Sequence, residues 1–476
     1  MQGWTLRSVP RQLREAITVR GQLVGSRASR SVAATVSENA GHAGHTRGGN
    51  TQMGDAVASV TTGARTIDAD FALIGHQESW RAAADVLAVL RGPERTPLPD
   101  EEIKDILPWI PPRAVCHVDV GSIIRTKSGA ARARGLYIDS FIPPDRLEAA
   151  YVHENIARVR GAAACAIKAG AKIVSLGGFS SILIEGNFDQ LPERHHTVFT
   201  TGNTLTVAFI VQGIQKMCAL EGRNLSRSTL LIVGATGDVG SGCARCLAPI
   251  VKRVLLSARK VERLRRLAAE LQDDGVQVEV ATDLQQFSTE ADVVICAASL
   301  ASPSLLLGRI APDAIVCDAG YPKNLSPTAE MLDAKVFFGG LGQITGGMKF
   351  TPDFHGVLNR HPFPDVVHGC LLEGMALALE HRFEAFSQGR GFITQERVDE
   401  IGTIAARHGI YLAPLYNADG PLEDGLDARW NGREDESMGE RPSRTVGRIE
   451  RRTSGHRRSS HVRADLMGGL SAPYFI

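Results

Sequence analysis

Three glycines spaced by three, Gly234, Gly237 and Gly240, are the residues whose chemistry is easiest to interpret. The apolar run Leu230–Val233 leads directly into them, and the helical pattern Asp238–Leu247 follows. Glycines at such a point allow a tight turn and let the backbone approach a pyrophosphate, while the helix start supplies free N–H groups. The spacing predicts a dinucleotide site, and a glycine-rich turn in a parallel sheet is the alternative. The expected cofactor-binding residues are Gly234, Ala235, Thr236, Gly237, Asp238, Val239, Gly240, Arg259, Lys260, Ala298 and Ser299.

Arg259 and Lys260 indicate which dinucleotide is bound. They follow the next expected strand, Arg253–Ser257, at the place where NAD sites carry an Asp or Glu for the ribose hydroxyls. Two cations suit a 2′-phosphate instead, so we expect NADPH. The alternative is a pair of solvated charges at the start of a helix.

Cys370 is the candidate nucleophile. We expect it near the start of a helix within residues 365–386, where the helix dipole and free N–H groups lower the pKa of a thiol. Glu373 lies one turn further on the same face and would relay a proton or contribute to packing. His368, two residues before Cys370, is expected to point away from it on the helix surface. The alternative for Cys370 is a buried small apolar residue.

Tyr321 and Lys323 follow the expected strand Ile315–Asp318, which places them at the carboxyl edge of the sheet, where ligands bind in such folds. Lys323 could stabilise an oxyanion, and an ordinary surface lysine is the alternative. The run Thr200, Thr201, Gly202 and Asn203 reads from its residues alone as a loop that caps the next helix.

The elements that must position these residues alternate between strand and helix. From Thr229 to Asp318 short apolar strands alternate with helical patterns, which is typical of a parallel sheet. We therefore expect an α/β fold with a Rossmann-like, doubly wound parallel sheet, an N-terminal α/β substrate domain and a C-terminal helical segment. The expected domains are a disordered leader at 1–65, a substrate domain at 66–225, an NADP-binding domain at 226–345, a helical segment with the cysteine at 346–416 and a disordered Arg-rich tail at 417–476.

The two polar ends leave alternatives open. Residues 1–65 are Arg-rich and acid-poor, which fits a transit peptide or a start codon assigned too early, with Met53 as the true start. The tail could be a nucleic-acid or membrane-surface segment, although disorder is the simpler interpretation.

Composition excludes several classes of function. Apolar residues make up 43% and charged residues 22%, and the formal net charge is +1, so we expect no nucleic-acid partner. No apolar run is long enough for a membrane span. Cys243 and Cys246 lack further ligands, so we expect packing and no metal. Scattered cysteines and no export signal favour the cytoplasm.

Several motifs in order resemble one known family. They read Phe71-Ala-Leu-Ile-Gly-His76, Leu136-Tyr-Ile-Asp-Ser140, Ser175-Leu-Gly-Gly-Phe-Ser180, Phe199-Thr-Thr-Gly-Asn203, Val233-Gly-Ala-Thr-Gly-Asp-Val-Gly-Ser241, Asp318-Ala-Gly-Tyr-Pro-Lys-Asn324, Cys370-Leu-Leu-Glu373 and Arg407-His-Gly409. Residues of about 70 to 415 thus resemble the cyanobacterial-type long-chain acyl-[acyl-carrier-protein] reductases. The surroundings of Cys370, Val-His-Gly-Cys-Leu-Leu-Glu-Gly-Met, differ from the family's usual pattern, as do His355 and His361.

The resemblance implies an activity and roles for residues. It implies NADPH-dependent reduction of a fatty acyl thioester, carried by acyl-carrier protein or CoA, to a fatty aldehyde, with an aldehyde-consuming enzyme as a further partner. Cys370 matches the family's catalytic cysteine, with Glu373 and Lys323 as its expected catalytic neighbours. The expected substrate residues are Phe179, Thr200, Thr201, Gly202, Asn203 and Tyr321. A shikimate-dehydrogenase-like alcohol dehydrogenase, which needs no cysteine, and a non-catalytic NADP-binding protein are the alternatives.

Overall fold

The computed structural model describes residues 69–423 except 93–97, 127–128, 148, 186, 193–195, 274, 282–286, 299–309, 321–322, 324, 326–333, 359 and 390. Two of the residues expected in the site, Ser299 and Tyr321, lie outside the described residues. Within the described part, no helix combines the length and apolarity needed to cross a membrane.

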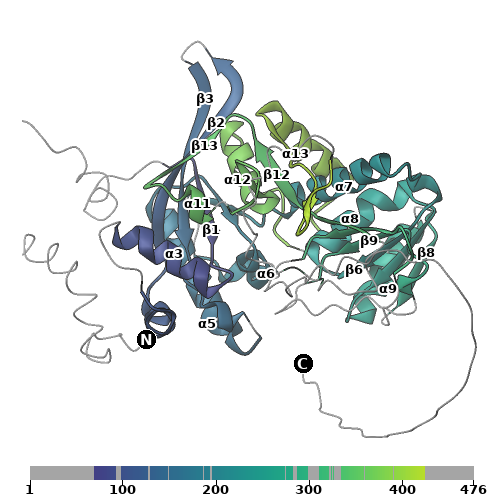
Figure 1. The fold of residues 1–476 in the computed structure, drawn as a ribbon, viewed down its shortest axis with the longest axis horizontal. Helices are drawn as coiled ribbons and strands as arrows, with labels where there is room; N and C mark the ends of the chain where they lie inside the picture. Colours follow the sequence, from purple (N-terminus) through teal and green to yellow (C-terminus); the bar gives the residue numbers. More distant parts are fainter. Residues whose placement is uncertain are drawn as a thin grey trace, which may run out of the picture. The chain divides into compact units, whose positions relative to one another are not determined.

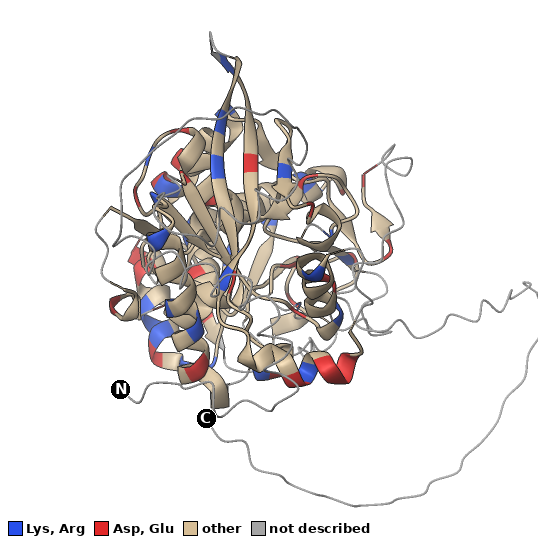
Figure 2. Cartoon of the chain, turned by 90° about the vertical axis from the view of Figure 1, so that its left-hand side faces the viewer, with Lys and Arg blue, Asp and Glu red and all other residues tan. Residues whose placement is uncertain are grey.

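The first sheet contains two short strands, β1 and β4, that are buried at every residue. Its order is β13-β2-β3-β1-β4-β5. The pairs β3–β1, β1–β4 and β4–β5 are parallel, whereas the pairs β13–β2 and β2–β3 are antiparallel. The strands are β1 (Phe71–Gly75), β2 (Arg113–Thr126), β3 (Gly129–Asp139), β4 (Ile173–Leu176), β5 (Val198–Thr200) and β13 (Met348–Thr351). The β2–β3 hairpin projects beyond its neighbours (Figure 1), and basic residues are spread along it (Figure 2).

Helices cover both faces of this sheet because successive strand residues point to opposite sides. Phe71 and Leu73 belong to a core shared with α3, and the intervening Ala72 and Ile74 belong to a second core with α5. The helices are α3 (Trp80–Arg91), α4 (Asp100–Ile106), α5 (Val152–Lys168), α6 (Phe179–Ile184) and α11 (His355–Leu358).

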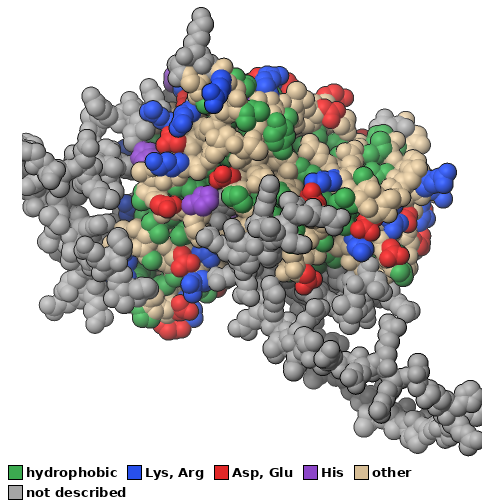
Figure 3. Space-filling view, turned by 45° about the horizontal axis from the view of Figure 1, so that its top comes forward, with side chains coloured by type: hydrophobic (Ala, Val, Ile, Leu, Met, Phe, Trp, Pro, Cys, Tyr) green, Lys and Arg blue, Asp and Glu red, His purple; other side chains and the backbone are tan. Residues whose placement is uncertain are grey.

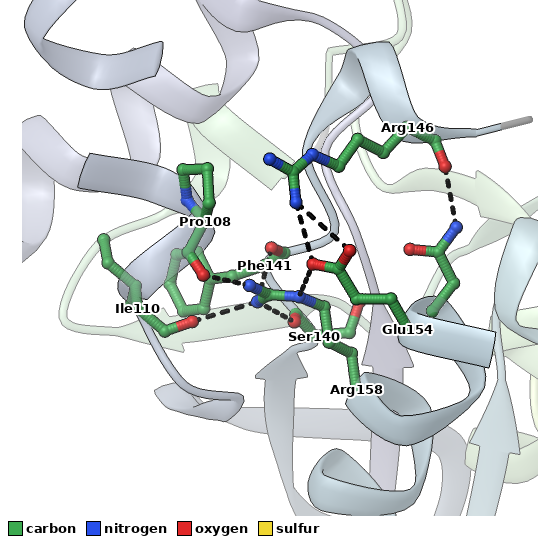
Figure 4. Close-up of polar contacts among 8 residues, drawn as sticks. Pro108, Ile110, Ser140, Phe141, Arg146, Glu154 and Arg158 are labelled. Atoms are coloured by element: carbon green, nitrogen blue, oxygen red, sulfur yellow. Dashed lines mark hydrogen bonds and ion pairs between the residues drawn. The ribbon is translucent and has the colours of Figure 1, made fainter. Parts of the chain in front are cut away.

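A half-buried arginine connects α5 to the loops at the end of the first sheet. Arg158 donates to the carbonyl oxygens of Ile110 at 3.0 Å and Phe141 at 2.8 Å, and also to that of Pro108 (Figure 4). Its charge is balanced by Glu154, which also accepts from Arg146. One side chain therefore satisfies several backbone acceptors that would otherwise lack donors.

The second sheet is fully parallel, with the order β11-β10-β9-β6-β7-β8. Numbered from β6, this is the 3-2-1-4-5-6 order of a doubly wound dinucleotide-binding fold. The strands are β6 (Thr229–Val233), β7 (Arg253–Ser257), β8 (Val278–Ala281), β9 (Val293–Cys296), β10 (Ile315–Asp318) and β11 (Lys335–Phe338), and the helices are α8 (Asp238–Leu247) and α9 (Val261–Asp273). The expected fold class is confirmed.

Three helices connect the two sheets. They are α7 (Asn203–Leu220), α12 (Gly369–Leu379) and α13 (Gln395–Arg407), and α7 contacts α8, α12 and α13. One apolar core runs through them, including Phe71 from the first sheet, Phe209 from α7 and Leu256 from the second sheet. The cofactor-type sheet and the first sheet are therefore packed on a common set of helices.

The region expected to be one helix over 365–386 is divided, which corrects the sequence analysis. It begins as a strand, β14 (Val366–His368), and only then becomes α12. The strand β12 (Leu341–Ile344) pairs antiparallel with β14 and with β15 (Ile410–Leu412). A final hairpin of β16 (Tyr416–Asn417) and β17 (Gly420–Pro421) extends the described structure beyond the expected boundary at 416.

Candidate active site

The glycine loop after β6 is shaped by close backbone contacts. A Cβ atom on Gly234, whose φ is +83°, would lie 2.6 Å from the carbonyl oxygen of Ala297, and one on Gly240 would lie 2.4 Å from that of Gly234. Only glycine fits both positions, so α8 starts directly against the crossing between β6 and β9. This is the switch point where doubly wound sheets bind dinucleotides.

A cavity opens at this switch point, and we name it the loop cavity. It is lined by Gly178, Ser181, Ile182, Glu185, Asn203, Thr206, Gly237, Asp238, Val239, Ala297, Ala298, Ala319, Gly320, Lys323, Gly339, Gly340, His368 and Cys370. Four of the expected cofactor residues, Gly237, Asp238, Val239 and Ala298, are therefore in its wall. The remaining described residues of the glycine loop, Gly234, Ala235, Thr236 and Gly240, form the turn beside it.

A second cavity, which we name the sheet cavity, lies at the end of β1. Its apolar wall comes from Ala82, Leu341, Val357, Leu358 and Leu371, and its polar wall includes His76, Gln77, Tyr137, His361 and Tyr416. Gly178, Gly320, Lys323, His368 and Cys370 line both cavities. The candidate nucleophile is thus in the wall that the two cavities share.

Cys370 is the second residue of α12 and is 9% exposed. Burial raises the pKa of its thiol to about 11, and hydrogen bonds from the backbone of Gly178 and Leu371 act in the opposite direction. The helix start was expected to lower this pKa. That expectation is wrong, because the loss of hydration on burial raises the pKa by more than the backbone hydrogen bonds lower it.

Three glycines bring other segments into contact with the start of α12. A Cβ on Gly202 would lie 1.9 Å from the carbonyl oxygen of Cys370, and one on Gly369 would lie 2.8 Å from the Thr206 Cα. One on Gly177 would lie 2.6 Å from the side chain of Leu371. The cysteine is therefore held between the loop after β4 and the start of α7.

Glu373 is fully buried and lines neither cavity. Its Oε1 accepts from the Thr200 hydroxyl at 2.5 Å, and its Oε2 accepts from the backbone N–H of Leu205 at 3.0 Å. Burial raises its pKa to about 7, and these hydrogen bonds moderate the increase. The carboxyl group thus caps the first turn of α7 from a neighbouring helix.

Lys323 reaches the shared wall because the loop after β10 folds around a carboxylate. The Asp318 side chain accepts from the backbone N–H groups of Gly320 at 3.0 Å and Leu325 at 3.1 Å. The Lys323 ammonium donates to the Asp318 carbonyl at 3.3 Å and lies 4.9 Å from the centre of the Phe338 ring. At 9% exposure it is not an ordinary surface lysine.

His368 corrects the sequence analysis most directly. It precedes α12 as its N-cap residue, so the helical geometry used to turn it away from Cys370 does not apply. Its ring lies edge-on to His361 at 5.1 Å, and His361 Nδ1 shares a hydrogen bond of 2.7 Å with the Tyr416 hydroxyl. Burial, with His361 and the charge of Lys323, holds the pKa of His368 well below its usual value.

Most of the expected substrate residues do not line the cavities and instead contact the elements that hold the cavity walls. Asn203 lines the loop cavity, whereas Thr200, Thr201 and Gly202 contact the helices around Cys370 and α8. Phe179 stacks on His76, with ring centres 5.9 Å apart. Sequence reasoning missed His76, His361 and Tyr416, because no local pattern shows that their segments meet at one cavity.

Arg259 and Lys260 are exposed directly after β7, at the carboxyl edge of the second sheet. They do not line either cavity, and the carbonyl oxygen of Lys260 accepts from the first turn of α9. On the face seen in Figure 3, charged side chains of both signs are interspersed with apolar ones.

Comparison with known proteins places this chain in a family. The shikimate/quinate 5-dehydrogenase family model matches residues 216–338, which contain the second sheet. The long-chain acyl-[acyl-carrier-protein] reductase of Synechococcus elongatus is 30% identical over 350 residues, covering 71% of this chain and 97% of the relative. The chain belongs to the long-chain acyl-[acyl-carrier-protein] reductase family. It is therefore an oxidoreductase that uses a nicotinamide cofactor.

Two further similarities are more distant. The aminotransferase PigE of a Serratia species is 24% identical over 261 residues, which cover 52% of this chain and 29% of PigE. The L-tryptophan dehydrogenase of Nostoc punctiforme gives a TM-score of 0.23 at 12% identity, covering 43% of this chain and 57% of that one. A structural likeness this low supports no argument about function.

Proposed function

We propose that this protein reduces a long-chain fatty acyl thioester, carried by acyl-carrier protein or CoA, to a fatty aldehyde through an acyl-enzyme on Cys370. The position of Cys370 in the wall of both cavities carries the proposal. A thiol there can take an acyl group from one side and present the same carbonyl to a hydride donor on the other. The reductase of Synechococcus elongatus supports the substrate class.

NADPH is the proposed cofactor, and when bound in the loop cavity it supplies the hydride. The glycine turn, whose contacts leave no room for a Cβ, fits a closely approaching pyrophosphate. The two cations after β7, Arg259 and Lys260, support a 2′-phosphate over free ribose hydroxyls.

His368 accepts the Cys370 proton in our proposal, and Lys323 stabilises the oxyanion. The thiolate sulfur attacks the thioester carbon, the bond to the carrier sulfur breaks, and the proton on His368 passes to the departing thiolate. The low pKa of His368 makes the neutral imidazole a weak base, so we propose that the proton leaves Cys370 as the sulfur attacks; it also makes the imidazolium a ready donor to the departing thiolate. Lys323 lines both cavities, so its ammonium is the cation that we propose to stabilise the developing negative charge.

Glu373 acts as a positioning residue in this scheme. It holds Thr200 and the start of α7 against α12, so its substitution would displace Cys370 without removing a reacting group. The sulfur leaves again as a thiolate when the aldehyde is released, and a proton from solvent restores the thiol.

The proposal is tested by mixing the protein with palmitoyl-CoA or palmitoyl-acyl-carrier protein without NADPH. Intact mass should increase by one acyl group located on the peptide with Cys370, and NADPH should release it as aldehyde. Cys370→Ala should form no adduct and still bind NADPH. Cys243→Ala is the matched control, because this thiol is fully buried in α8 and lines neither cavity.

His368→Ala should slow adduct formation and leave NADPH binding intact. His355→Ala changes a residue outside both cavities and should not slow adduct formation. Aldehyde formation by Cys370→Ala at the wild-type rate would contradict the covalent route.

An alcohol dehydrogenase of the shikimate type is the second candidate, favoured by the family match over residues 216–338. It requires no thiol, so shikimate oxidation by both the wild type and Cys370→Ala would favour this function over reduction of an acyl thioester.

A further inference from the structure

Every turnover of the proposed reaction takes up one proton from solvent. A thioester, NADPH and one proton give an aldehyde, the free carrier thiol and NADP+. After the hydride has added to the acyl carbon, the bond from that carbon to Cys370 breaks and its electron pair stays on sulfur. The thiol of Cys370 is then restored by a proton that reaches a residue only 9% exposed. The protein therefore has to bring a proton to a nearly enclosed atom.

His361 is the titratable ring in contact with His368. Both histidines line the sheet cavity together with Cys370. Their rings meet edge-on with centres 5.1 Å apart, and His361 is half-buried, so solvent still reaches part of it. The third histidine of this cavity, His76, stacks on Phe179. A proton on His361 is therefore one ring away from the group that exchanges protons with Cys370 in the proposed mechanism.

Tyr416 fixes the ring of His361. The Tyr416 hydroxyl shares a hydrogen bond of 2.7 Å with His361 Nδ1. Tyr416 itself is 1% exposed and packs edge-on against Phe338 and Phe363, with ring centres 5.4 and 5.7 Å away. Because a phenol hydroxyl can both donate and accept, the bond persists whether or not Nδ1 carries a proton. His361 can therefore gain and lose a proton without turning.

The charges around His368 favour transfer of a proton onward to sulfur. Burial holds the pKa of His368 well below its usual value, and His361 and Lys323 lower it further. Such a ring seldom captures a proton from water at pH 7, and neighbouring cations disfavour its charged form. Burial raises the pKa of the Cys370 thiol to about 11, so a proton that does reach His368 passes readily to the thiolate.

We propose that His361, held by Tyr416, delivers the solvent proton to Cys370 through His368. The inference rests on the proposed function. An N–H bond of the His361 imidazolium breaks as one forms on His368, and the His368 proton then forms the S–H bond of Cys370. Both histidines end the step neutral, and His361 takes its next proton from water or buffer.

The test measures proton uptake and aldehyde release in a single turnover of the full chain. The acyl-enzyme is formed with palmitoyl-CoA, the free CoA is removed, and NADPH is added in weak buffer with a pH indicator. In the wild type, one proton should be taken up per aldehyde, at the rate of aldehyde release. In His361→Gln, proton uptake should lag behind aldehyde release about a hundredfold, and added imidazole should shorten the lag.

The comparison of the two rates within one protein separates proton delivery from a structural role. A displaced Cys370 would slow aldehyde release, but proton uptake would still keep pace with it. Tyr416→Phe keeps the packed ring and removes the hydroxyl, so its lag should be about tenfold, as for the loss of one hydrogen bond. His355→Gln and Tyr411→Phe are the matched controls and should show no lag, because these residues line neither cavity.

Proton uptake that keeps pace with aldehyde release in His361→Gln would overturn the inference, whether or not both rates fall. If the wild type formed no acyl-enzyme at all, the proposed function would fail first and the inference with it.

Discussion

The Cys370 thiol is surrounded by protein on nearly all sides, and this sets its reactivity. With a pKa raised to about 11, only a small fraction is thiolate at neutral pH. We expect alkylation of Cys370 by iodoacetamide to be much slower at pH 7 than that of free cysteine. The rate should rise about tenfold per pH unit up to pH 9, because the thiolate is the reacting form. Peptide mass spectrometry measures it, and a rate independent of pH would contradict the described burial.

Arg259 decides between cofactors in our proposal. Replacing Arg259 with Asp removes a cation from the 2′-phosphate and adds a repelling charge, so the KM for NADPH should rise roughly ten- to hundredfold. The KM for NADH should change little. Steady-state kinetics with both cofactors test this, with Arg263→Asp on the following helix as a control. Equal activity of the wild type with NADPH and NADH would remove the argument for Arg259.

At the scale of elements, the contact between Gly202 and the carbonyl of Cys370 joins the starts of α7 and α12. Gly202 has φ +71°, and an added Cβ would collide with backbone atoms of Cys370. Gly202→Ala should therefore reduce both the melting temperature and acyl-enzyme formation. Gly222→Ala is the control, because its φ of +63° carries a similar backbone strain with nothing within 4 Å of the new Cβ. It should cost only about 1 kcal/mol.

If Gly202→Ala and Gly222→Ala lowered the melting temperature equally, the packing of Gly202 against α12 would add nothing to stability beyond the backbone strain that both substitutions introduce.

The sequence predicted some elements well and others poorly, for identifiable reasons. The bounds of β6, α8, β7 and β10 agree with expectation, because uninterrupted apolar runs and the glycine loop mark them. Strands β12 and β14 were missed, since each has only three or four residues and pairs with distant segments. The apolar Val366 and Val367 continue without a break into α12, so His368 was placed on a helix.

At the scale of the whole molecule, residues that make stabilising contacts extend slightly beyond the expected boundary at residue 416. Glu423 accepts from Lys216 at 2.7 Å and from the backbone N–H of Leu415 at 2.7 Å. A chain shortened to residues 66–423 should keep the wild-type melting temperature and activity, because the composition of the removed ends cannot support a core.

A chain ending at residue 416 should melt at a lower temperature, because it loses Glu423 and the β16–β17 hairpin. Calorimetry and NADPH consumption compare the two, and an inactive but folded 66–423 chain would show that the ends take part in the reaction.

The proposed covalent mechanism, with Cys370 in the wall shared by the two cavities, also predicts the order in which reactants bind and leave. In that mechanism the acyl group would be transferred to Cys370 before any dinucleotide binds, and the freed carrier would leave through the cavity by which it entered. Initial-rate measurements at several concentrations of both reactants should then give parallel double-reciprocal lines, the signature of a ping-pong sequence. The carrier would be the first product to appear, and it would appear even when no aldehyde can form.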